Sequence, residues 1–155
     1  MLFQRINRSD PEKVFIVVKN SYSTGSLTNG QPVRWDYTTD KDGVGVTKPT
    51  ANAVSHGVSV AGIAAETIAH NSYGLLQVYG YHSAVRVRTI STTGNGDNGY
   101  AAIAVGTPLV QAVTSVFALE GKDISATNNL HPSGFALAAQ ASFTTKAIAA
   151  FIRCL

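Results

Sequence analysis

HGVSVAGIAAETIAHNSYGLLQVYGYHSAVRVR, residues 56–88, is the stretch of this chain that decides its fold. Apolar and polar side chains alternate on both sides of a polar turn, with Val58 and Val60 before the turn and Leu76 and Val78 after it. A period of two predicts β-strands, because successive side chains of a strand point to opposite faces. The stretch contains no pattern typical of catalysis or metal binding, so we expect it to be scaffold.

The first third of the chain continues this pattern. Residues 14–19 form an apolar run that predicts a strand, and residues 33–37 alternate apolar with charged side chains. Between them, Asn29-Gly30 is a dipeptide typical of two-residue turns, which predicts a hairpin at this point. Residues 38–52 are polar and contain two glycines and a proline, so we expect an excursion over the surface.

The last third predicts four further strands. Two of them are expected between residues 101 and 121, after a loop rich in Gly, Asn and Asp. The segment SGFALAA, residues 133–139, followed by a polar stretch and an apolar run, parallels HGVSVAG, residues 56–62, with its own polar stretch and apolar run. This parallel predicts two equivalent hairpins.

The final ten residues are compatible with two structures. Ile148, Phe151, Ile152 and Leu155 have the spacing of one helix face, and the neighbouring alanines favour a helix. The parallel with the middle hairpin favours a strand over residues 146–155, and we predict a strand.

These patterns together predict an all-β fold, either an antiparallel sandwich or a small barrel, with a jelly-roll-like arrangement. Residues 1–13 show neither period and are expected to be an extended N-terminal arm. Residues 14–155 are expected to form a single β domain, because a chain of 155 residues can bury about 70% of its unfolded surface.

The composition favours a surface that is covered by other proteins. Only 14% of the residues are charged, against about 25% in most soluble domains. The net charge of +3 comes from 12 basic and 9 acidic residues that are scattered along the chain, so no nucleic-acid partner is predicted. The nearest candidates for a phosphate-binding face are Arg5, Arg8, Arg86 and Arg88.

A few positions in the sequence bear on disulfide formation and on the cellular compartment. The single cysteine, Cys154, cannot form a disulfide within one subunit and has no neighbouring metal-binding partner in the sequence. Charged residues precede the first apolar run, which argues against a secretory signal, and no apolar run approaches a membrane span. We therefore predict synthesis in the cytoplasm and no membrane partner.

Four patterns resemble binding or catalytic motifs, and we interpret each of them as structural. Gly94, Gly96 and Gly99 spell a dinucleotide fingerprint, but the segment after them is too short and too β-like to be its helix. Asp40 and Asp42 begin like a calcium loop that is not completed. The histidines lack zinc spacing, and a triad of Ser72 or Ser83 with His82 and Asp97 has no nucleophile elbow. We predict no catalytic residues, no metal site and no cofactor.

Several segments resemble the small virion proteins of tailed bacteriophages that decorate or cement the capsid. The resemblance is carried by LTNGQPVRWDYTTDKDGVGVT, GIAAETIAHNSYGLLQVYGYHSAVRV, VGTPLV and GFALAAQASFTTKAIAAFIRCL, and its most particular phrase is residues 72–80. Leu75 stands where the pattern would have Trp.

The resemblance implies a β-rich structural protein that is not an enzyme and that sits on the outer surface of the capsid. Its implied partners are the major capsid protein and itself, as a homotrimer. The arm has apolar anchors without internal periodicity, so we expect it to contact the shell or a neighbouring subunit. The predicted contact residues are Leu2, Phe3, Arg5, Ile6 and Arg8.

Two other classes of function stay open from the sequence. A receptor- or glycan-binding β module of a phage appendage would expose aromatic side chains among Trp35, Tyr79 and Tyr81. A small hydrolase would show activity on simple ester or glycoside substrates.

Overall fold

The computed structural model of this chain describes residues 12–40, 43–49, 60–89, 102–112, 117–121, 132–141 and 144–154. Within these residues the chain forms nine β-strands and no helix, so it contains no helix that could cross a membrane. The strands are β1 (Lys13–Asn20), β2 (Pro32–Trp35), β3 (Gly45–Thr47), β4 (Val60–Ala64), β5 (Tyr73–Arg88), β6 (Pro108–Gln111), β7 (Leu119–Gly121), β8 (Gly134–Ala136) and β9 (Lys146–Arg153).

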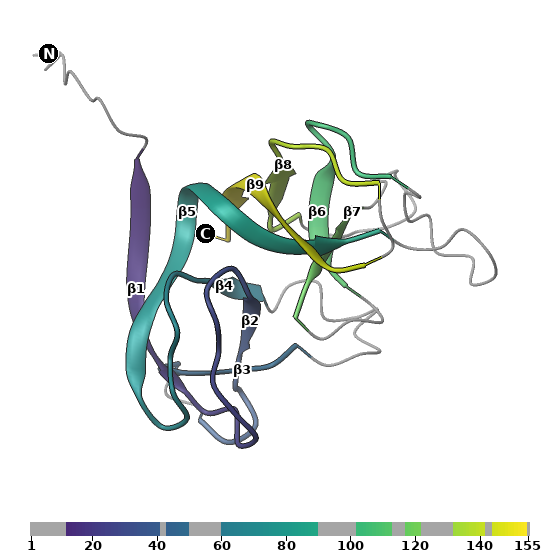
Figure 1. Cartoon of the computed structure of the whole chain (residues 1–155). Coiled ribbons are helices and arrows are strands. Elements are labelled where there is room, and N and C mark those ends of the chain that lie inside the picture. Colours follow the sequence, from purple (N-terminus) through teal and green to yellow (C-terminus); the bar gives the residue numbers. More distant parts are fainter. Residues whose placement is uncertain are drawn as a thin grey trace, which may run out of the picture.

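The strands close into two small barrels that share β5 (Figure 1). In the first barrel the order is β1-β3-β2-β4-β5, and pairing of β1 with β5 closes the ring. In the second barrel the order is β5-β7-β6-β8-β9, and pairing of β5 with β9 closes it. Each strand therefore has a hydrogen-bonded neighbour on both sides.

The shared strand is long enough to serve both rings. β5 has 16 residues, and β1 and β9 have eight each. The first half of β5 pairs with β1 from Tyr73 to Gly80, and the second half pairs with β9 from Tyr79 to Val87. Figure 1 shows β5 as one teal ribbon that passes from the first barrel into the second.

The two barrels repeat the same connectivity. When each strand is matched with the strand four places later, every pairing recurs with the same direction, including the two parallel pairs β1–β3 and β5–β7. The residue register of the inner pairs recurs as well. Pro32↔Ile63 and Val33↔Gly62 correspond to Pro108↔Phe135 and Leu109↔Gly134, and the bridge Leu27↔Ile68 corresponds to Ile103↔Gln140.

The turn before β2 recurs before β6 in its local detail. Gly30 and Gly106, 76 residues apart, have φ angles of 82° and 87°. In the first turn the side chain of Gln31 accepts a hydrogen bond from the amide of Thr28, at 2.7 Å. In the second turn the hydroxyl of Thr107 accepts one from the amide two positions before Gly106, at 3.0 Å. The chain is thus built from one unit used twice.

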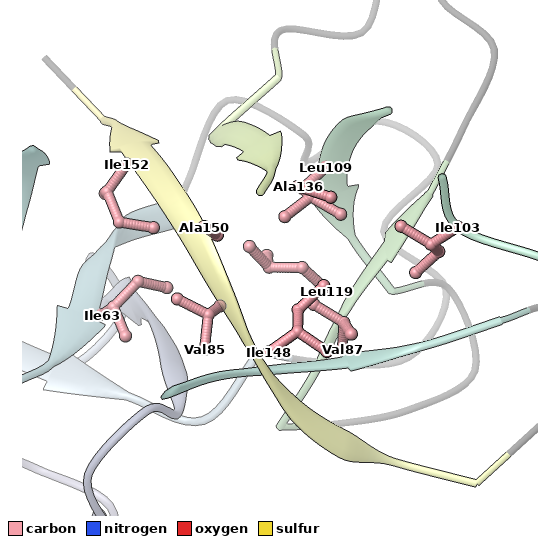
Figure 2. Close-up of a cluster of buried hydrophobic side chains, with 10 residues drawn as sticks. All are labelled: Ile63, Val85, Val87, Ile103, Leu109, Leu119, Ala136, Ile148, Ala150 and Ile152. Atoms are coloured by element: carbon pink, nitrogen blue, oxygen red, sulfur yellow. The ribbon is translucent and has the colours of Figure 1, made fainter. Parts of the chain in front are cut away.

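Each barrel has its own apolar core. In the second core, side chains from β5, β9, β6 and β7 point toward one another between the ribbons (Figure 2). Ile63 of β4 belongs to this second core, so it joins the two barrels. Six positions of the two cores are equivalent by register. They are Val18 and Val85, Leu27 and Ile103, Val33 and Leu109, Val46 and Leu119, Ala64 and Ala136, and Leu76 and Ala150.

Much of the predicted fold is confirmed. The described residues are all-β and form small barrels, and residues 146–153 are a strand, as predicted. The β4–β5 and β8–β9 hairpins occupy equivalent places in the two barrels, as predicted. The register matches Gly134 with Gly62, however, so the alignment of residues 133–139 with 56–62 drawn from the sequence was shifted by five residues. The two parallel strand pairs go beyond the antiparallel arrangement that we expected. The division into an arm and a single domain stays a prediction.

Two local predictions were wrong. The turn at Asn29-Gly30 exists, but the strands on either side of it do not pair, because β3 lies between β1 and β2. Residues 38–52 are not only a surface excursion, since they contain β3. Both errors have one cause: β3 is only three residues long, and it pairs with β1 as well as with β2, which directly precedes it.

His82 lies where β5 passes from one barrel to the other. Its side chain is 6% exposed, and its Nδ1 accepts a hydrogen bond from the amide of Ala84 at 3.1 Å. Burial lowers the pKa of His82, and the positive charge of Lys13 lowers it as well. A hydrogen bond with the backbone of Ala64 raises the pKa but does not outweigh these two effects. The imidazole is therefore a neutral part of the junction at neutral pH.

The turn glycines provide a matched pair of substitutions. A Cβ on Gly30 would lie 1.9 Å from the carbonyl oxygen of Ala84, whereas a Cβ on Gly106 would meet nothing within 4 Å. We expect Gly106→Ala to cost about 1–2 kcal/mol, the cost of a left-handed alanine. We expect Gly30→Ala to cost about 3 kcal/mol or more, because the backbone of β5 must also move. Urea unfolding measures both, and equal losses would contradict this account.

Acidification is expected to destabilise the fold through His82. Because the pKa is lowered in the folded state, the unfolded chain binds the proton more readily, and the free energy of unfolding falls as pH drops below about 6.5. Thermal unfolding between pH 7.5 and 5 should show a falling midpoint in the wild type and a flatter profile in His82→Gln. The control is His70→Gln at an exposed position. Identical pH profiles for wild type and His82→Gln would refute the assignment.

Candidate functional site: an apolar patch on β1 and β5

Large apolar side chains cover the outer face of the first barrel along β1 and β5. Val17 is 64% exposed and Tyr73 is 66% exposed, and three neighbours are more than a third exposed. We call this set the β1–β5 patch. Its members are Val14, Phe15, Val17, Tyr73 and Leu75.

Strand geometry places these side chains together. Val18 and Leu76 point into the first core, so Val17 and Leu75 point outward, and the register sets Val17 directly opposite Leu75. The register of β1 shifts between Val14 and its neighbour, which lets two successive apolar residues of β1 stay exposed. The patch is thus fixed by backbone hydrogen bonds on a rigid pair of strands.

An aromatic group adjoins the patch on the second barrel. Tyr79 packs edge-on against Phe151, with ring centres 5.1 Å apart, and Phe151 stacks on Phe135 at 5.2 Å. Phe135 is itself 39% exposed. We call these three residues the aromatic ladder. Val14 lies opposite Tyr79 in the register, so the patch and the ladder meet along β5.

The patch is suited to binding a protein surface. Contiguous exposed apolar groups are rare on monomeric proteins and mark surfaces that another molecule covers. A partner is expected to contact these outward side chains; β1 pairs with β5 along Lys13–Lys19 and with β3 only at Lys19 and Asn20. The patch contributes burial energy, which is non-directional, and its shape supplies the specificity.

The candidate catalytic and metal-binding residues do not form a catalytic or metal site in the described part of the chain. His82 is bonded to the backbone, and the exposed His70 has its Nδ1 2.9 Å from the carbonyl oxygen of Tyr22. Burial raises the pKa of the Cys154 thiol to about 12, so it is not a reactive thiolate at neutral pH. No group of three metal-ligating side chains occurs among these residues. The absence of catalysis and of cofactors stays a prediction.

Several predicted residues lie outside the described part of the chain. The arm positions Leu2, Phe3, Arg5, Ile6 and Arg8 belong to residues 1–11, and the glycine-rich segment 94–99 with Asp97 also falls outside. Of the remaining triad candidates, Ser83 is exposed and Ser72 lies in the β4–β5 turn.

The aromatic residues predicted for a glycan-binding module are partly covered. Trp35 packs against the first core, Tyr79 belongs to the aromatic ladder, and Lys13 lies 5.9 Å from the ring centre of Tyr81. None of these three is among the exposed large side chains of the described residues.

The sequence contained a signal for the patch that we did not use. Residues 14–18, VFIVV, are apolar at every position and do not alternate. Such a run in an antiparallel sheet indicates that both faces of the strand are covered. One face is covered by the first core, and the other is the patch.

Comparison with known proteins gives one structural likeness to report. No protein-family model and no curated protein matches the chain. Among solved structures, the chain is similar to one described as "The crystal structure of head fiber gp8.5 N base in bacteriophage phi29". The TM-score is 0.49 at 12% identity, over 92% of this chain and 96% of that chain. At this level of similarity, function has to be inferred from the surface of this chain itself.

Proposed function

We propose that this protein is a virion structural protein that binds the outer surface of a phage capsid and stabilises it as a cement or decoration subunit. The observation that carries the proposal is the β1–β5 patch, an apolar outer face on rigid strands. The sparse charge of the chain and its resemblance to phage decoration proteins support the same reading. Its partners are then the major capsid protein and copies of itself.

We assign the β1–β5 patch to contacts between subunits of a homotrimer. Interfaces that form permanently are more apolar than the remaining surface, whereas transient ones resemble it. A head-to-tail contact repeated around a three-fold axis closes on itself and leaves no free patch. Such a trimer suits the three-fold positions of a capsid shell.

We assign the arm to the shell. β1 begins at Lys13, opposite Gly80 in the middle of β5, so the arm joins the fold where the two barrels meet and next to the patch. The arm offers apolar anchors and two arginines, whereas the barrel around it carries few charges. A subunit bound in this way stabilises the expanded shell by mass action, because it binds the assembled state only.

A charge placed in the patch tests the trimer. We expect Val17→Asp to dissociate the trimer into monomers, because the carboxylate would be buried without a partner. Light scattering coupled to size-exclusion chromatography measures the mass. Ala147→Asp on β9 is the matched control, since it adds the same charge at an exposed strand position away from the patch. A wild-type monomer, or a Val17→Asp variant that stays trimeric, would refute this assignment.

Removal of the arm tests the contact with the shell. We expect deletion of residues 1–10 to leave the trimer and its thermal midpoint unchanged, because β1 starts at residue 13. Binding to particles that lack the protein should fall at least about tenfold, since several apolar anchors are lost. Cosedimentation with these particles measures the binding. Undiminished binding would remove the arm from the proposal, and a wild-type protein that binds no particles would overturn the cement function.

A further inference from the structure

A cavity of about 590 Å³ with a mixed polar and apolar lining opens at one end of the first barrel. It lies between the chain that follows β1, strand β2 with its following turn, and the end of β3. A cavity of this size is within the range of sites for small ligands. The residues that matter for its chemistry are Ser21, Tyr22, Arg34, Thr38, Thr39 and Lys48.

Two cations of this cavity lack a carboxylate partner among the described residues. The Nε of Arg34 donates to the carbonyl oxygen of Lys48 at 3.2 Å, and its Nη1 donates to the hydroxyl of Tyr37 at 3.1 Å. The Nζ of Lys48 lies 5.7 Å from the ring centre of Tyr22 and 5.1 Å from that of Phe117. Their contacts with aromatic rings and neutral oxygens position both cations but leave their charges uncompensated.

Asp36, the one carboxylate among the described residues of the first cavity's lining, already accepts several hydrogen bonds. Asp36 accepts hydrogen bonds from the hydroxyls of Thr38 and Thr39 and from the amide of Thr39. Burial raises the pKa of Asp36, but these hydrogen bonds outweigh burial and hold the pKa below its ordinary value. Asp36 therefore stabilises the turn, and the described residues of the first cavity carry a net positive charge.

The second barrel shows that the fold does not need this charged cluster. By strand register, Arg34 corresponds to Val110, and Lys48, which follows Thr47, corresponds to Gly121. Asp36, which follows β2, corresponds to Ala112, and Val110 and Ala112 are both buried. The same unit thus folds with small or apolar residues at all three positions. The cluster is an addition to the first barrel only, which points to a ligand.

The cavity continues into a second polar space. A cavity of about 360 Å³ shares Ser21 and Thr39 with the first and is further lined by Lys19, Asp40 and Asn71. Together the two cavities form an extended groove whose described lining carries hydroxyl, amide and charged groups and one aromatic ring, that of Tyr22. Such a lining suits a ligand that carries many hydroxyl groups together with an anionic group.

We propose that this groove binds a saccharide that carries an anionic group, a carboxylate or a phosphate, with Arg34 and Lys48 on the anion and the Ser and Thr hydroxyls on the sugar. The cations of the site lie on β2 and directly after β3, and the second cavity reaches Lys19 of β1, opposite Tyr73 of the β1–β5 patch. The inference is argued from the charges and the cavities and does not rest on the capsid-binding function. A particle that carries many such subunits would present many copies of a weak glycan site, and multivalency raises the avidity of such an array.

The test compares acidic saccharides with their neutral parents. The purified full-length chain is titrated with glucuronic-acid and sialic-acid oligosaccharides, with glucose 6-phosphate, and with the uncharged counterparts, and binding is followed by calorimetry and NMR. We expect saturable binding of acidic ligands only, weakened by salt because the contact is ionic. The carboxylate and phosphate arms distinguish the two anions. Absence of binding to every acidic saccharide, or equal binding of the neutral ones, would overturn the proposal.

Substitutions locate the binding. We expect Lys48→Gln and Arg34→Gln each to weaken binding about tenfold or more, because each removes a charge-assisted contact. Lys146→Gln on β9 is the matched control, since it removes the same charge at an exposed position outside the groove. Thermal midpoints verify that each variant is folded, and Arg34→Lys keeps the charge should Arg34→Gln fail to fold. Binding that survives Lys48→Gln, or tighter binding of a tetraglutamate peptide than of any saccharide, would contradict the assignment.

Discussion

The backbone hydrogen bonds of β5 are the constraint on which the rest of this structure depends. One strand pairs with β1 and β4 in its first half and with β7 and β9 in its second half, so neither barrel can close without it. This explains why residues 73–88 form a single strand without a turn. It also explains why His82 is buried and why Gly30 packs closely on Ala84. The turn before β2 must fit against the part of β5 that continues into the second barrel.

The two barrels have kept one architecture and have acquired different surfaces. The first carries the apolar β1–β5 patch and the charged groove, and the two surfaces adjoin where Lys19 of the groove lies opposite Tyr73 of the patch. A subunit that uses the patch against its sisters and the arm against the shell can leave the groove open to the solvent. The apolar surface then supplies permanent contacts, while the groove keeps its cations available for a ligand. This separation is what allows a structural protein to carry a second, weaker binding property.

The sequence predicted the strands with a clear period and missed the features that depend on distant pairing. Alternation around Val60, Leu76 and Val85 was sufficient for β4 and β5. The likeness of residues 133–139 to residues 56–62 predicted a second hairpin correctly, although the structure aligns residues 133–139 with a segment that starts five residues later. The three residues of β3 were too few to show a period, so the parallel pairing and the groove that β3 forms with β2 could not be foreseen. The repeat was hard to see in the sequence because equivalent positions carry side chains of different size. In the first barrel Gly74 packs on Ile68. In the second barrel Ile148 is equivalent to Gly74, and Gln140 is equivalent to Ile68. Its visible trace was Gly-x-Pro at residues 30–32 and again at 106–108.

The length of β5 follows from its double use. Each barrel uses about eight residues of its closing strand, and β5 has 16 because it closes one barrel and belongs to the next. Ile63 of the first unit is buried by the second barrel, whereas its equivalent in the second unit, Phe135, is 39% exposed. The aromatic ladder therefore lies at the place that corresponds, in the first unit, to the seam between the two barrels.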